Sequence, residues 1–253
     1  MMKKVLLVAV SLLTLGFGTV QAQSKFTFKV GGGFPLGDFG DVKTRVDNEG
    51  NSVPSQWGLI DNYKNGGAGL GFNLGVQWKL AEISAVKGLD LILSVDGFYN
   101  GLNSDLRDAF DDLRDEVEGE SGVSDFTLRT PKYLNFPVML GLNWGTGIAP
   151  NIGFFCEAAA GANLRVITNV HEEFEYTSGR SHEYTMSFNP AVTFGFRAAA
   201  GLIFNNKYSV ELGYYNLGAA KVKGEREGDS ESEKFTGGKI TPTFLTLRLG
   251  IAL

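Results

Sequence analysis

The chain has 253 residues, a formal net charge of -5, 34 glycines, 19 phenylalanines, seven prolines and one cysteine. An acidic chain of this kind is poorly suited to nucleic-acid binding through phosphate neutralisation, and one cysteine excludes an intramolecular disulfide framework. Abundant glycine and phenylalanine with little proline favour many short strands over helices.

The first 22 residues have the pattern of a secretory signal peptide. Lys3 and Lys4 precede an apolar run that reaches Phe17, and a small-residue cleavage site ends at Ala22. Cleavage there would leave a mature domain of residues 23–253. The apolar run is too short for a stable membrane anchor. We therefore expect an exported protein.

Eight later segments carry large apolar side chains at every second position. In an extended chain this spacing places those side chains on one face. The clearest case is the last segment, where Leu245, Leu247 and Leu249 alternate with small or charged residues. The segments cover residues 26–30, 70–78, 89–95, 133–144, 154–165, 192–204, 209–215 and 244–253.

The opposite face of these segments carries nine charged residues, five basic and four acidic. A basic side chain that points into lipid at mid-bilayer costs about 2–4 kcal/mol, whereas one that points into a barrel can pair with an acid. We predict inward ion pairs between Glu211 and Arg248 and between Glu157 and Arg197. The predicted lumen charge network comprises Lys29, Lys79, Asp90, Asp96, Glu157, Arg165, Arg197, Glu211 and Arg248.

The gaps between segments alternate regularly in length. Long gaps at 35–67, 100–130, 168–188 and 218–240 are separated by short gaps at 81–88, 145–150 and 205–207. Outer-membrane barrels have short periplasmic turns and long external loops. The alternation therefore predicts an all-β fold: an eight-stranded antiparallel up-and-down transmembrane β-barrel in the outer membrane, with both termini in the periplasm.

Aromatic residues gather near both ends of the predicted strands, as is typical of membrane interfaces. The predicted aromatic girdle comprises Phe26, Trp78, Trp144 and Tyr208 at the periplasmic rim, and Phe34, Tyr99, Tyr133 and Tyr214 at the outer rim. Two local irregularities are also expected. The glycines at 31–33 predict a bend or bulge, and Pro137 predicts a bulge because it removes a donor in mid-strand.

The chain resembles the PorT-like outer-membrane β-barrel domain family of Gram-negative bacteria of the Bacteroidota type. The resemblance rests on the Ala-Gln signal junction, the glycine-rich first strand, the run Tyr133 to Pro137 that enters the fourth strand, and the alternating last strand. It implies a small outer-membrane barrel and no single activity. Leu253 and Asn135 depart from the family, where an aromatic end and an acid are more usual.

The long loops hold the remaining candidate chemistry. The second loop predicts a short amphipathic helix, capped by Asn103 or Ser104, with an apolar stripe of Leu106, Phe110, Leu113 and Val117. Its acidic face could gather divalent cations that bridge lipopolysaccharide, although such a run is more often a solvated face.

His171 and His182 of the third loop lack the spacing of a zinc or hydrolase site. The last loop, 221–234, is expected to be mobile.

Together these patterns predict a non-enzymatic outer-membrane protein with a lumen plugged by charged side chains. No catalytic residue, cofactor or metal is expected, and nucleic acid is excluded as a partner. Outer-membrane lipid and lipopolysaccharide would surround a monomer whose external loops serve a protein partner or an envelope-structural role. Three alternatives stay open: a lipid-modifying enzyme that uses the loop-three histidines, a secretion-machinery component, and a narrow solute channel.

Overall fold

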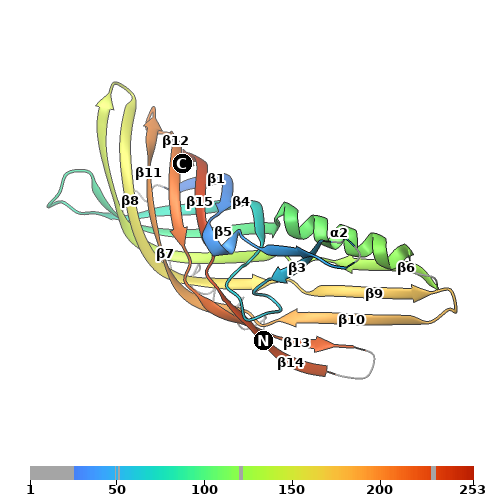
Figure 1. Cartoon of the computed structure of the whole chain (residues 1–253). Coiled ribbons are helices and arrows are strands. Elements are labelled where there is room, and N and C mark those ends of the chain that lie inside the picture. Colours follow the sequence, from blue (N-terminus) through green and yellow to red (C-terminus); the bar gives the residue numbers. More distant parts are fainter. Residues whose placement is uncertain (1–25, 49, 51, 120–121, 229–231) are drawn as a thin grey trace.

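The computed structural model describes residues 26–253 except 49, 51, 120–121 and 229–231 (Figure 1). Eight strands close into a barrel in the order β1-β15-β12-β11-β8-β7-β5-β4. Each of these strands lies beside its neighbours in chain order, and β1 pairs antiparallel with β15 to close the sheet. The predicted eight-stranded antiparallel up-and-down barrel is confirmed. The predicted signal peptide, residues 1–22, lies outside the described residues.

The barrel strands follow the predicted segments and extend several of them. The turn between β7 and β8 contains only Pro150 and Asn151, so it is shorter than predicted. Between β11 and β12, Asn205 and Asn206 both have positive φ, as in a type I′ turn. The strands are β1 (Phe26–Pro35), β4 (Ala68–Glu82), β5 (Leu89–Leu102), β7 (Tyr133–Ala149), β8 (Ile152–Ile167), β11 (Ala191–Phe204), β12 (Tyr208–Asn216) and β15 (Thr243–Ala252).

Side chains of the barrel alternate between an apolar exterior and a polar lumen. In β15, Leu247 and Leu249 are 52% and 60% exposed, whereas Thr246 and Arg248 have no exposed surface. The single cysteine, Cys156, lies on the exterior. We define the outer belt as the exposed apolar residues Phe28, Val30, Leu70, Phe72, Leu74, Val138, Leu140, Leu142, Val192, Phe194, Phe196, Val210, Leu212, Leu245, Leu247 and Leu249.

Three of the four long connections fold together into a second sheet beyond one end of the barrel (Figure 1). This five-stranded sheet, which we call the outer sheet, has the order β14-β13-β10-β9-β6. The last loop forms β13 and β14 in its described residues. The outer-sheet strands are β6 (Val123–Arg129), β9 (Val170–Tyr176), β10 (Ser181–Phe188), β13 (Ala220–Glu227) and β14 (Ser232–Ile240).

The first and second loops pack beside the outer sheet. The first forms a 3-10 turn, η1 (Gly37–Phe39), and the hairpin β2 (Lys43–Val46) and β3 (Ser52–Gln56). The second forms the helix α2 (Ser104–Gly119), which lies against β6 and β3. Asn103 caps the helix, because its Oδ1 accepts the Leu106 N–H at 2.9 Å. Within the described residues, no helix has the length and apolar character needed to cross a membrane.

No bulge occurs at residues 31–33 or at Pro137, because the strand register runs through both places without a shift. β1 keeps one register with both neighbours across residues 31–33. Gly31 instead leaves room for β15, since a Cβ there would lie 2.0 Å from the Leu247 carbonyl oxygen. Beside Pro137, the β5–β7 register is the same before and after the proline. The missing N–H therefore interrupts the ladder but does not distort it.

Seven of the eight predicted girdle aromatics lie on the outer face of the barrel. Phe26 and Trp78 pack together there with ring centroids 4.8 Å apart, at the end that carries the short turns. Tyr133 is the exception and the prediction for it is wrong. Tyr133 lies two residues before Asn135 in β7, so both side chains point into the barrel, and that of Tyr133 is fully buried. The first loop folds over it, and the Tyr133 hydroxyl donates to the Gly66 carbonyl.

Candidate functional site

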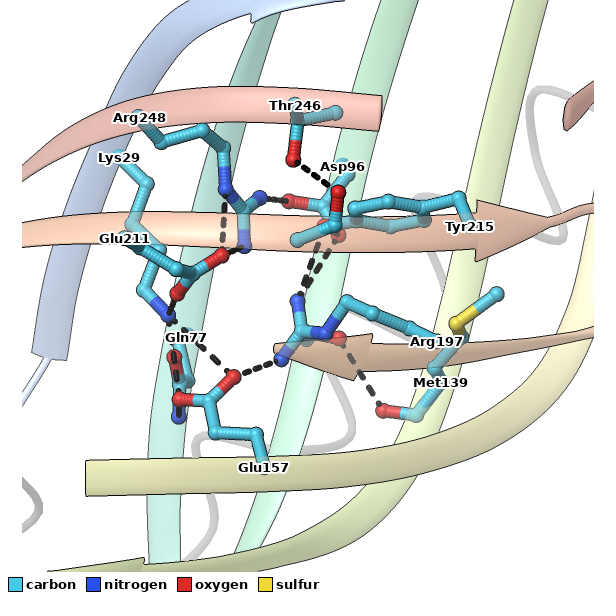
Figure 2. Close-up of polar contacts among 12 residues, drawn as sticks. Lys29, Gln77, Asp96, Met139, Glu157, Arg197, Glu211, Tyr215, Thr246 and Arg248 are labelled. Atoms are coloured by element: carbon cyan, nitrogen blue, oxygen red, sulfur yellow. Dashed lines mark hydrogen bonds and ion pairs between the residues drawn. The ribbon is translucent and has the colours of Figure 1, made fainter. Parts of the chain in front are cut away.

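Six charged side chains meet inside the barrel and form a closed ring of alternating sign (Figure 2). We call this set the charge ring. Its members come from six different strands, and none is more than 5% exposed. Three are basic and three are acidic, so the ring is formally neutral. In order around the ring they are Lys29, Glu157, Arg197, Asp96, Arg248 and Glu211.

One half of the ring is centred on Lys29 of β1. Its Nζ lies 2.5 Å from Glu211 Oε2 and 3.2 Å from Glu157 Oε1. Glu157 also accepts a hydrogen bond from the guanidinium of Arg197. The predicted pair between Glu157 and Arg197 is therefore present, and Lys29 joins it to Glu211.

The other half is centred on Asp96 of β5. Arg248 Nη1 donates to Asp96 Oδ1 at 2.7 Å, and Arg248 Nε donates to Glu211 Oε1 at 2.8 Å. Arg197 Nη1 lies 3.4 Å from Asp96 Oδ2. The Tyr215 hydroxyl donates to the same Oδ2 at 3.2 Å, and the centroid of its ring lies 5.6 Å from the Arg197 guanidinium carbon and 5.4 Å from that of Arg248. The predicted pair between Glu211 and Arg248 is present as well.

The two barrel strands without a ring charge contribute neutral amides. Gln77 of β4 donates from Nε2 to Glu157 Oε1 at 2.7 Å, and Asn143 of β7 donates to the same oxygen at 3.3 Å. Every barrel strand therefore supplies at least one side chain to the ring or to its hydrogen bonds. The sequence prediction missed Gln77, Asn143 and Tyr215 because it collected charges only. All three residues occupy positions of their strands whose side chains point inward, and this alternation in the sequence could have identified them.

An aromatic layer fills the lumen between the charge ring and the outer sheet. Phe98 lies 4.9 Å from the ring of Tyr215 and 4.7 Å from that of Phe244. Phe39, carried by η1 of the first loop, packs edge-on against Phe244 at 5.2 Å and against Tyr133 at 5.3 Å. All five side chains are buried. The first loop therefore seals this end of the barrel with apolar side chains.

Three residues of the predicted lumen network lie outside the charge ring. Lys79 pairs with Asp90 at 2.6 Å near the end with the short turns, and both side chains are partly exposed. Arg165 lies at the opposite end and is 2% exposed. It donates to backbone carbonyls of Ile240 at 3.0 Å and Ala220 at 3.3 Å. Arg165 therefore anchors the base of β13 and β14.

The two histidines of the third loop lie on opposite faces of the outer sheet. His171 pairs in register with Thr185 of β10, three residues from His182, and paired residues share a face while neighbours alternate. His171 Nδ1 lies 3.1 Å from Thr185 Oγ1 and 3.5 Å from a Glu183 carboxylate oxygen. The His182 ring instead packs against Tyr176 at 5.6 Å. The pair is therefore not brought together as one site.

The charges of the ring satisfy one another. Each of its carboxylates is bound by two cations, and each cation by two carboxylates. A buried pair of this kind is stable only while it stays matched. In the described part of the chain, no group of three or more His, Cys, Asp or Glu side chains is placed to hold a metal ion. The ring and aromatic layer define a small closed barrel with a side-chain-filled interior.

No family model matches the chain, and no curated protein matches it. Solved outer-membrane proteins are similar in structure. The attachment invasion locus protein Ail of Yersinia pestis, in complex with the heparin analogue sucrose octasulfate, is 12% identical over 92% of this chain and 100% of that chain, with a TM-score of 0.34. A major outer membrane protein from Thermus thermophilus is 12% identical over 92% and 100%, with a TM-score of 0.45. AlkL in lipid bilayers is 11% identical over 93% of each chain, with a TM-score of 0.39.

Proposed function

We propose that the chain is an integral outer-membrane β-barrel protein of a Gram-negative envelope and that it is not an enzyme. The observation that carries this proposal is the outer belt, which surrounds a closed barrel whose charges lie inside. Large exposed apolar surfaces of this kind mark protein–protein or membrane interaction sites. A closed barrel also satisfies its strand backbone groups internally, as lipid requires. The PorT-like resemblance is consistent with this assignment.

The barrel serves as a plugged scaffold. An eight-stranded barrel has an interior just wide enough for side chains to fill. Here the charge ring and the aromatic layer fill it, apart from a cavity of about 260 Å³ at the short-turn end. Planar-bilayer recordings of the purified protein are expected to show no discrete conductance. A conductance that changes when Arg197 or Arg248 is neutralised would support the narrow-channel alternative instead.

The outer sheet then faces the cell exterior, where its strands and α2 supply the interaction or structural role. The short turns and both termini face the periplasm. Ordered sheet, not free loop, presents the external surface, so a partner would meet a preformed face at a low entropic cost. A stable co-purifying envelope protein would point to the secretion-machinery alternative.

Two epitope tags test the insertion and its direction. One is placed in the segment that joins β13 to β14 and a matched one in the β11–β12 turn, between Asn205 and Asn206. Antibody is expected to label the first on intact cells and the second only after the outer membrane is permeabilised, with heat-modifiable gel mobility for both. The opposite labelling would reverse the orientation, and recovery in the soluble fraction would refute membrane insertion.

The enzyme alternative has a direct assay. Purified protein is incubated with lipid A, and no modified product is expected. His171 and His182 lie on opposite faces of the outer sheet, which supports this expectation. Product formation that is lost in His171→Ala or His182→Ala would overturn the non-enzymatic assignment.

A further inference from the structure

A groove of about 780 Å³ opens at the end of the barrel that carries the long loops. One wall is formed by residues of the first loop between 35 and 41. The other wall is formed by residues 102–104 and 107, at the start of α2. The floor is the beginning of β4, residues 68–70. Three separate parts of the chain therefore shape the groove.

Hydrogen bonds hold the two walls and the floor together. The Gly67 N–H, directly before β4, donates to the Asp41 carbonyl of the first wall at 2.9 Å. Asn103 of the second wall donates from its N–H to the Gly67 carbonyl at 2.8 Å and from its Nδ2 to the Gly40 carbonyl at 2.9 Å. The groove is therefore preformed, and a ligand would bind there at a low ordering cost.

The floor continues the lipid-facing surface of the barrel. Leu70 belongs to the outer belt and is 71% exposed. It lies two residues beyond Phe72 toward the long loops, and the Phe72 ring stacks on that of Tyr99 with centroids 5.2 Å apart. Aromatic residues at strand ends mark the interface between acyl chains and head groups. The groove therefore begins at the level of the lipid head groups.

The two walls carry charges of opposite sign. Asp38 and Asp41 lie on the first wall and Arg107 on the second, and all three are exposed. In the part of the chain that the structure describes, neither aspartate has a basic side chain within ion-pair distance. Arg107 Nε lies 3.8 Å from the Asp108 carboxylate, and an exposed pair of this kind contributes little. All three charges are therefore accessible to a ligand.

A head group that carries both signs of charge fits this arrangement. A primary ammonium can donate hydrogen bonds to Asp38 and Asp41, whereas a quaternary ammonium has no N–H to donate. A phosphate can pair with Arg107 and accept from the Ser104 hydroxyl, near the positive end of the α2 dipole. An anion without the ammonium would lie near two uncompensated carboxylates, which repel it.

We propose that this groove binds an outer-leaflet lipid whose head group carries a phosphate and a primary ammonium, as phosphoethanolamine does. The ammonium lies at Asp38 and Asp41 and the phosphate at Arg107, and the acyl chains run over Leu70 onto the outer belt. The volume of the groove is within the roughly 300–1,000 Å³ typical of small-ligand sites. This inference rests on the proposed membrane insertion and names the lipid that the barrel selects.

Native mass spectrometry of the full-length mature protein in detergent tests the site. The probes are phosphatidylethanolamine, phosphatidylcholine and phosphatidylglycerol with identical acyl chains, so that contacts with the outer belt are the same for all three. The first phosphatidylethanolamine is expected to bind about five- to tenfold more tightly than either of the other lipids. Equal binding of the three lipids would refute the site.

Matched variants locate the selectivity. Asp38→Asn combined with Asp41→Asn is expected to reduce the preference for phosphatidylethanolamine over phosphatidylcholine to about twofold or less, and Arg107→Gln to weaken both lipids about threefold. Asp61→Asn in the first loop and Arg114→Gln in α2, exposed charges outside the groove, should change neither. An undiminished preference in the double variant, or unchanged binding in Arg107→Gln, would contradict the proposal. Heat-modifiable mobility and membrane recovery of each variant are measured separately, so a folded, inserted barrel without selectivity counts against the site alone.

Discussion

At the scale of single residues, the charge ring is arranged so that no member has only one partner. Glu157 lies between Lys29 and Arg197, and Glu211 lies between Lys29 and Arg248. Removing one member therefore leaves two buried neighbours with an incomplete partner set. Removing two adjacent members of opposite sign leaves the remaining four still matched. Charge balance, more than any one contact, sets the stability of the lumen.

This balance predicts a rescue. Arg197→Met is expected to destabilise the barrel by about 3–5 kcal/mol, because Glu157 and Asp96 each lose a buried counter-charge. The double variant Arg197→Met with Glu157→Gln should recover much of that loss, since Lys29 with Glu211 and Arg248 with Asp96 remain paired. Urea unfolding in lipid vesicles measures both. A double variant less stable than Arg197→Met would contradict the balance.

The space for the ring depends on glycine at particular positions. A Cβ at Gly75 would lie 2.0 Å from Asp96 Oδ1, whereas a Cβ at Gly32 would have nothing nearer than the Phe34 ring at 3.7 Å. Gly75→Ala is therefore expected to cost about 1–3 kcal/mol through overpacking, measured by urea unfolding. Gly32→Ala, the matched control in the neighbouring strand, should cost much less. Equal losses would show that Gly75 serves another purpose.

At the scale of elements, the outer sheet has an apolar face that also holds a glutamate. Phe126 of β6 and Phe174 of β9 pack together on that face with ring centroids 4.6 Å apart. Glu172 of β9 shares the face, because it lies two residues from Phe174. Burial raises the pKa of Glu172 above its usual range, and the nearby charge of Arg226 offsets only part of this. The ionised carboxylate therefore opposes formation of the sheet.

The direction of the pH dependence follows. With a raised pKa the folded sheet binds the Glu172 proton more tightly than the unfolded chain, so this residue's contribution to stability falls as pH rises above the usual glutamate range of about 4.3. Glu172→Gln is expected to slow proteolysis of the β9–β10 hairpin at pH 7, and the difference should disappear near pH 4. Glu175→Gln, an exposed neighbour on the opposite face, is the control. Faster proteolysis of Glu172→Gln at pH 7 would contradict the effect.

The barrel strands could be predicted from sequence, and the outer sheet could not. Each barrel strand faces apolar surroundings on one side throughout, so the period of two persists over its length. In β9 that period is broken by Glu172, which takes an inward position between Val170 and Phe174. The sheet also pairs β6 with β9 and β10 with β13, strands from different loops. Such pairing depends on how the barrel places the loops.

At the scale of the whole molecule, the chain places apolar side chains outside and matched charges inside. Alternation and parity were enough to predict which charges point inward. They also predicted the pairs Glu157–Arg197 and Glu211–Arg248 on neighbouring strands. They did not predict the contacts of Lys29 and Asp96 that close the ring, because these depend on height along the barrel. Lys79 and Arg165 have the inward parity of the ring members but lie nearer the two ends. The position of Phe39 in the lumen could not be predicted either, because nothing in the sequence of a long loop shows that η1 carries this one aromatic residue into the barrel.

The most direct test of this account is the environment of the outer belt in lipid vesicles. Spin labels are attached singly at Val138, Leu212 and Leu247 in a Cys156→Ala background, with a label at Ser181 of the outer sheet for comparison. The belt labels are expected to collide with oxygen, which dissolves in acyl chains, far more often than with a water-soluble nickel chelate, and the Ser181 label should show the reverse. Belt labels that the chelate reaches as readily as it reaches Ser181 would contradict the membrane-spanning barrel.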